Sequence, residues 1–155
     1  MDSMDAGIKQ LPRLPAGKRY YTAEEADRAL VLVRRIVGDV VNYYRQVLDF
    51  QEILETCQTQ GSSEQIEQAQ RDLARRVEKL QACADELVEL GLELKDWGAG
   101  VVDFPALFDG REIMFCWQRD EATVKFWHEV DAGCGGRQEI SMLLASPIEV
   151  QAERI

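Results

Sequence analysis

Apolar residues between residues 22 and 90 recur at alternating intervals of four and three positions, the spacing of one face of an α-helix. The pattern predicts a first helix that begins after Thr22 and a second that ends before Gly91. Thr22 followed by Glu25 is a capping-box signature, and Gly61 interrupts the pattern. Because a short polar loop joins two long apolar faces, we predict an antiparallel helical hairpin over residues 22–90.

A second set of apolar residues on these helices lies outside the repeating face. Two helices alone cannot cover this set, so we expect it to pack against the C-terminal part of the chain and against a second copy of the protein. The pattern therefore predicts a homodimer that forms through the helical arms. The residues of this second set are Ile36, Val41, Leu48, Ile53, Val88 and Leu90.

After Gly91 the apolar spacing changes to the alternation that is typical of β-strands. Residues 101–108 and 111–117 are predicted to form a β-hairpin with a two-residue Asp109-Gly110 turn. Pairing the two residues next to this turn brings three apolar cross-strand pairs onto one face. We expect Pro105, which has no amide hydrogen, to make the first strand an edge strand. The pairs are Phe108 with Arg111, then Ala106 with Ile113, Phe104 with Phe115 and Val102 with Trp117.

A third strand is predicted over residues 123–130, followed by a glycine-rich turn over residues 131–137. We expect its inner face to contain Val124, Phe126, His128 and Val130, which would leave Trp127 on the more exposed side. The predicted fold is thus α+β, a long antiparallel helical hairpin packed against a small antiparallel sheet.

The elements predict a single domain at residues 20–145, with the helical hairpin at 22–90 and the β module at 97–140. Residues 1–19 are interpreted as a flexible N-terminal lead-in and residues 146–155 as a frayed tail.

The formal net charge is −10 at pH 7. Binding to nucleic acid needs clustered basic residues, so this balance opposes a nucleic-acid surface, and it also opposes attraction to anionic membranes. The chain contains no apolar run of the ~18–20 residues that span a bilayer. Residues 1–18 show no apolar secretory segment either. We therefore predict neither a nucleic-acid partner nor a membrane association.

Four cysteines, Cys57, Cys83, Cys116 and Cys134, show no CxxC pairing. Without an export signal, reduced thiols in the cytoplasm are the expected state.

Short motifs in the C-terminal half lie at residues 101–106, 109–111, 116–117, 127–133 and 136–138. In order and spacing they resemble a bacterial family known as domain of unknown function 2203. The resemblance covers residues 20–140 and includes the Tyr-Thr-Ala-Glu-Glu-Ala segment at the start of the first helix. It implies a bacterial protein and no particular activity, because the family is uncharacterised. The family usually has an aromatic residue where this chain has Cys134, so a role that depends on Cys134 would not be a family role.

His128, the only histidine, could form a mixed metal site with Cys116, Asp131 and Cys134. The paired short spacings of structural zinc sites are absent, however, so the sequence predicts no metal and no cofactor. We expect His128 to be a neutral structural histidine, hydrogen-bonded to a backbone group or to a carboxylate such as Asp131 or Asp103.

Two functions remain open. The first is a cytoplasmic interaction or scaffolding protein without enzymatic activity, because no nucleophile–base pair and no catalytic residue can be identified. The second is a small-molecule or anion-binding module, which could include an enzyme, built on His128, Asp131 and Arg137; the glycine amides of residues 131–137 could bind a phosphate or carboxylate. Convergence of these side chains on an open pocket would favour the second. The candidate ligand-binding residues are Asp103, Arg111, Trp127, His128, Asp131 and Arg137.

Overall fold

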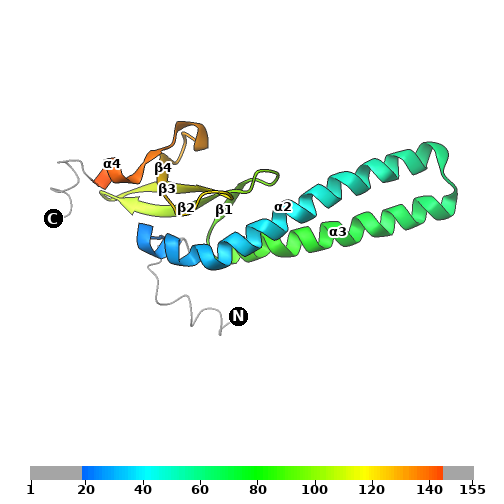
Figure 1. The fold of residues 1–155 in the computed structure, drawn as a ribbon, viewed down its shortest axis with the longest axis horizontal. Coiled ribbons are helices and arrows are strands. Elements are labelled where there is room, and N and C mark those ends of the chain that lie inside the picture. The colour runs from blue at the N-terminus through cyan, green and yellow to red at the C-terminus, as the bar shows by residue number, and fades with distance from the viewer. Residues whose placement is uncertain (1–18, 145–155) are drawn as a thin grey trace.

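The computed structural model describes residues 19–144. The predicted lead-in, apart from Arg19, and the predicted C-terminal tail lie outside the described residues. Two long helices form a hairpin that projects from one side of an antiparallel sheet (Figure 1). The predicted α+β class and the helical hairpin are confirmed. The helices are α2 (Ala23–Gln60), α3 (Ser63–Glu89) and the short α4 (Ile140–Leu144), with a 3-10 turn η1 (Cys134–Gly136).

Both long helices begin with a capping box. In α2 the Thr22 hydroxyl accepts a hydrogen bond from the Glu25 amide, and the Glu25 carboxylate accepts one from the Thr22 amide. Ser62 and Gln65 repeat this arrangement at the start of α3. The α3 C-terminus has the hydrogen bonds of a Schellman motif, with Gly91 in the position that favours glycine. These local signals fixed the helix ends as the sequence predicted.

The sheet has five strands in the order β1-β2-β3-β4-β5, all antiparallel. The predicted register of the central hairpin is confirmed at all four predicted pairs, from Phe108↔Arg111 to Val102↔Trp117. Asp109 and Gly110 both have positive φ, as a type I′ turn requires. The strands are β1 (Glu93–Asp96), β2 (Val101–Phe108), β3 (Arg111–Gln118), β4 (Phe126–Glu129) and β5 (Gln138–Glu139).

The prediction that Pro105 lies on an edge strand is wrong, because β1 pairs with β2 on the side opposite β3. The pairing of β1 covers residues 101–103 of β2 and stops before Pro105. Beyond that point the amide of Tyr21 donates a hydrogen bond of 2.8 Å to the Pro105 carbonyl. The proline is accommodated because no strand faces the side on which its amide hydrogen is missing.

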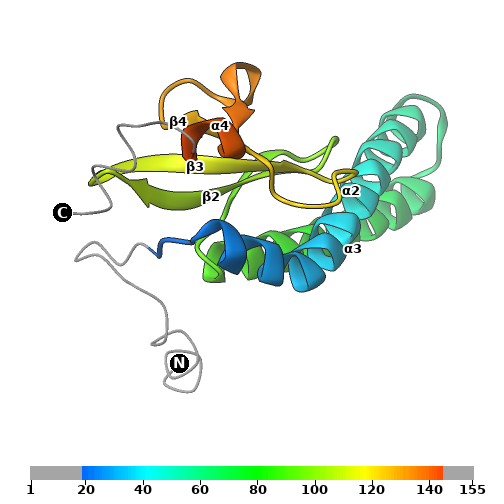
Figure 2. The same ribbon diagram turned by 60° about the vertical axis from the view of Figure 1, so that its left-hand side comes forward.

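One face of the sheet packs against the proximal part of the hairpin, which contains the start of α2 and the end of α3. Even-numbered residues of β2 and odd-numbered residues of β3 enter the same core as α2. Ile36 and Val41, two of the apolar residues outside the helical seam, are buried there. The C-terminal segment with η1 and α4 lies over the opposite face (Figure 2). The sheet is therefore covered on both faces.

The predicted orientation of the third strand is wrong. Trp127 pairs with Phe115, points toward the helices and is only 6% exposed, whereas His128 pairs with Met114 and points to the opposite face. Val130, expected on the inner face, is exposed. The regular strand begins at Phe126, so counting alternation from residue 123 misplaced its side chains. Val124 is nevertheless in the core, as predicted.

Within residues 19–144, no helix combines the length and the apolar character needed to cross a membrane.

Candidate functional site

Four potential ligand side chains meet on the sheet face that points away from α2 and α3. Their ligand atoms all lie within 4.8 Å of one another. Each comes from a different element, namely β2, β3, β4 and η1, so only the folded sheet brings them together. We call this group the Asp–Cys–His–Cys cluster; its members are Asp103, Cys116, His128 and Cys134.

The alternation of side chains along the strands explains the cluster. Asp103 lies between Val102 and Phe104, which face the helices, so its own side chain points to the other face. Its partner across the β2–β3 pair is Cys116, whose side chain therefore lies on the same face. His128 reaches this face because Trp127 occupies the helix side of β4.

His128 makes two hydrogen-bonding contacts, one from each ring nitrogen. Its Nδ1 lies 2.7 Å from the carbonyl oxygen of Glu129. A carbonyl only accepts hydrogen bonds, so Nδ1 carries the hydrogen. Its Nε2 lies 2.9 Å from Oδ2 of Asp103. Burial is the main cause that raises the pKa of Asp103, and the contact with His128 opposes this rise.

The two cysteines of the cluster are free thiols whose Sγ atoms lie 2.6 Å apart. The Cys134 Sγ is also 3.6 Å from Asp103 Oδ1 and 3.9 Å from His128 Nε2. Burial raises the pKa of both thiols. A reactive thiolate requires a lowered pKa, so the arrangement does not favour a cysteine nucleophile.

Arg137 borders the cluster. Its Nη1 lies 3.9 Å from Cys116 Sγ, and its Nη2 forms a salt bridge with Glu121. The guanidinium stacks on the Phe126 ring, with Cζ 4.0 Å from the ring centroid. These contacts place a fixed positive charge next to the thiols.

The six candidate residues from the sequence fall into three groups. Asp103 and His128 belong to the cluster, and Arg137 lies beside it. Trp127 is buried against the helices. Arg111 pairs with Glu129 at 2.7 Å on the surface, and Asp131 is exposed. Of the two carboxylates proposed as partners for His128, the structure selects Asp103.

The sequence suggested Cys116 and Cys134 as ligands of a mixed metal site with His128, but that site was not predicted because the cysteines show none of the ligand spacings of known zinc sites. One signal for Cys116 was present in the predicted hairpin register, which already places it opposite Asp103. No comparable local signal places Cys134 near them, because its position depends on how η1 folds back onto β4.

The cluster is closed rather than an open cleft. His128 is 1% exposed and Asp103 is 0% exposed. A substrate could not reach these groups without movement of the turn above them, so the geometry suits a small ion or a hydrogen-bonded network better than an organic ligand.

The fold and the cluster together define an α+β protein in which a helical hairpin is joined to a five-stranded sheet with a buried Asp–Cys–His–Cys cluster. The chain belongs to the family described as "Uncharacterized conserved protein (DUF2203)", which matches residues 19–140. The resemblance seen in the motifs is thereby confirmed. Comparisons with curated proteins and with solved structures found no match.

Proposed function

We propose that the protein is a non-enzymatic interaction protein that forms a homodimer through the distal half of its helical hairpin, residues 48–77. The observation that carries this proposal is the poor burial of that half. Among residues 48–77, Ala69 is the only buried side chain. Two helices that bury so little of their own surface gain little stability from their mutual packing, so a further partner would stabilise them.

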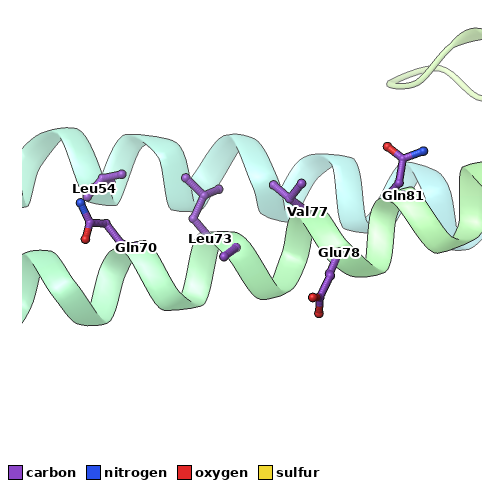
Figure 3. A pocket seen from close by; sticks show the side chains of 7 residues that line it. Leu54, Gln70, Leu73, Val77, Glu78 and Gln81 are labelled. Atoms are coloured by element: carbon purple, nitrogen blue, oxygen red, sulfur yellow. The ribbon is translucent and has the colours of Figure 1, made fainter.

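Apolar side chains remain exposed on this distal half. Leu48 is 48% exposed, Ile53 is 46% exposed and Val77 is 45% exposed. A groove of about 520 Å³ lies between the two helices, lined by Leu54 of α2 and by α3 side chains that include Leu73 (Figure 3). Val77 lines this groove, and an exposed apolar side chain in a groove between two helices supports a docking surface for another helix.

The charge distribution supports a second copy of this chain as the occupant. The distal part of α2 has the exposed acids Asp49, Glu52 and Glu55, and α3 has the exposed bases Arg71 and Arg75. In an antiparallel pair of hairpins, the acids Asp49, Glu52 and Glu55 of one copy can lie beside Arg71 and Arg75 of the other, although the distal part of α3 also has the exposed acids Glu64 and Glu67. Four helices packed in this way would form a bundle with an enclosed apolar core.

The test is the molar mass in solution, measured by light scattering during size-exclusion chromatography at roughly tens of micromolar protein. We expect twice the chain mass of 17.6 kDa. Val77→Lys should give the monomer, because it places a charge in the groove, whereas Val88→Lys, at an exposed valine of the same helix outside residues 48–77, should leave the dimer intact. A monomeric wild-type protein would refute the proposal.

The alternative, a small-molecule or anion-binding module that uses His128, Asp131 and Arg137, has less support. His128 is buried against Asp103, Arg137 is engaged with Glu121, and Asp131 is exposed. The three side chains do not converge on an open pocket within the described residues.

We also propose a cytoplasmic location in a bacterium. Four free cysteines support a reducing compartment, since the close Cys116–Cys134 pair would be exposed to oxidation elsewhere. The bacterial source rests on the family resemblance alone.

A further inference from the structure

We propose that the Asp–Cys–His–Cys cluster binds a zinc ion that fastens the glycine-rich turn to the sheet. This proposal is independent of the dimer, because the cluster lies in the sheet module and the groove lies on the distal hairpin. It also replaces the expectation of a metal-free protein that the sequence spacing suggested.

The number and type of donors in the cluster fit zinc. Two sulfurs, one imidazole nitrogen and one carboxylate oxygen are the donors that zinc uses in closed four-coordinate sites. The sulfur donors favour zinc over magnesium or calcium, which prefer oxygen ligands. All four positions are filled by the protein, so the site would be structural rather than catalytic.

The ligand atoms lie at spacings close to those of a tetrahedral zinc site. Tetrahedral zinc with its usual bond lengths places ligand atoms roughly 3.2–3.8 Å apart. The contacts between Cys134 and Asp103, at 3.6 Å, and between Cys134 and His128, at 3.9 Å, are close to this range, and the His128–Asp103 contact of 2.9 Å is slightly shorter. Of these four contacts, the one between the two Sγ atoms, at 2.6 Å, differs most and would need to lengthen by about 1 Å. Rotation of the half-buried Cys134 side chain would provide this movement.

His128 has the orientation of a metal-binding histidine. Its Nδ1–H donates to the Glu129 carbonyl, so a neutral ring presents the Nε2 lone pair to the cluster. The atom nearest to this lone pair is Oδ2 of Asp103, which as a carboxylate is also an acceptor. Two buried acceptors that face each other require a shared cation, either a proton or a metal. A backbone carbonyl bound to the remote ring nitrogen is the arrangement that holds metal-binding histidines in place.

The zinc-bound cluster would have a net negative charge, and a positive side chain lies beside it. Zinc binding would displace to solvent the thiol protons of Cys116 and Cys134 and the proton shared by His128 and Asp103, so three protons leave for each ion bound. Two thiolates, one carboxylate and Zn²⁺ sum to one negative charge. The guanidinium of Arg137, 3.9 Å from Cys116 Sγ, lies where it offsets this charge.

The proposed ion would connect three strands to the turn that follows them. Asp103, Cys116 and His128 are fixed by the pairing of β2, β3 and β4, whereas Cys134 belongs to a three-residue 3-10 turn bounded by glycines. Such a turn has few contacts of its own, so a metal bond would fix it in place.

The test is the metal content of protein purified under reducing conditions without chelators, measured by plasma mass spectrometry. We expect about one zinc ion per chain in the wild type and in the control Cys57→Ser, whose cysteine lies on α2 far from the cluster. Cys134→Ser and Cys134→Phe should lose at least about 90% of the zinc while circular dichroism remains unchanged.

A second measurement covers protein that is isolated without metal. Reduced, metal-free protein is titrated with Co²⁺, and we expect thiolate-to-cobalt absorption in the wild type and in Cys57→Ser but not in Cys134→Ser. Failure of the reduced wild type to bind either zinc or cobalt would overturn the proposal. A stable Cys116–Cys134 disulfide that persists in reducing buffer, or zinc that Cys134→Ser retains at the wild-type level, would overturn it as well.

Discussion

The imidazole of His128 and the carboxyl group of Asp103 face each other at 2.9 Å, and both side chains are excluded from solvent. His128 Nδ1 donates to the carbonyl oxygen of Glu129, so Nε2 of a neutral ring needs a donor or a cation from the direction of Asp103. Each of these two buried groups is therefore the hydrogen-bonding partner of the other. This relationship leads to the first prediction.

In metal-free protein, Asp103→Asn should be better tolerated than Asp103→Ala. The asparagine amide can donate to Nε2, whereas alanine leaves this nitrogen unpaired and should cost about 1–3 kcal/mol of unfolding free energy. His128→Ala should cost a similar amount, because it leaves the carboxyl group of Asp103 without its partner. Urea denaturation in the presence of a chelator measures all three variants. Equal stability of the asparagine and alanine variants would contradict the hydrogen-bond assignment.

Gly100→Ala should destabilise the protein more than Gly110→Ala. Both glycines have positive φ, which costs about 1–2 kcal/mol for a residue with a side chain. A Cβ at Gly100 would also lie 2.9 Å from Val37 Cγ1 and 3.1 Å from Val41 Cγ2, whereas a Cβ at Gly110 meets nothing within 4 Å.

The extra cost at Gly100 should be about 1–3 kcal/mol, because α2 and the sheet would have to move apart. The difference between the two melting temperatures measures this contact directly, since the backbone strain is common to both variants. If both variants melt together, the close packing of Gly100 against α2 is not rigid.

Tyr21→Phe should destabilise the protein at neutral pH and less so at alkaline pH. The Tyr21 hydroxyl donates to the Leu90 carbonyl at the C-terminus of α3, at 2.5 Å, and its loss should cost about 1 kcal/mol. Burial is the main cause that raises the pKa of Tyr21 above its usual value of 10.0, although Arg19 opposes the rise.

The folded state therefore holds the phenol proton more tightly than the unfolded chain. The resulting stability is fully present below the unfolded pKa and is lost as the pH rises through the folded pKa. Denaturation at a series of pH values should thus show the wild-type advantage over Tyr21→Phe decreasing above pH ~10. An advantage that stays constant across this range would show that ionisation of Tyr21 is not coupled to folding.

Arg137→Gln should cost more stability than Arg111→Gln, although both arginines pair with a glutamate. The side chains of the Arg137–Glu121 pair are 19% and 17% exposed, against 48% and 43% for Arg111–Glu129. Exposed pairs contribute about 0–1 kcal/mol, whereas Arg137 also stacks on Phe126, so we expect about 1–2 kcal/mol there. Thermal denaturation at low and at high salt measures the loss of stability in both variants. Salt screens exposed charges most, so it should reduce the loss caused by Arg111→Gln by the larger fraction. Equal losses would contradict this ranking.

A large part of the fold could be predicted from the sequence because its signals are local. Thr22 with Glu25 marked the start of α2, and Gly91 marked the end of α3. The register of β2 with β3 followed from the two-residue turn at Asp109, since the turn fixes which residues pair. The strands β1 and β5 were not predicted, because four-residue and two-residue segments contain too little alternation to be recognised.

The candidate site was predicted only in part. Asp103 was one of two carboxylates expected as partners of His128, and the structure shows this contact. The orientation of β4 was reversed, however, so Trp127 was expected outside and packs inside. Adjacent residues of a strand must point to opposite faces, and the sequence Trp127-His128 does not state which of them faces the core. The pairing of Trp127 with Phe115 determines it.

The sequence by itself determined the helical hairpin, its two capping boxes and the register of the central β-hairpin, because each depends on residues that are close together along the chain. Only the tertiary structure brought Cys134 to Cys116 and to Asp103, which is 31 residues away in the chain. It also left the distal hairpin poorly buried by placing the sheet against its proximal half alone. Contacts of this kind depend on how whole elements pack, and the spacing of residues within one element does not specify that packing.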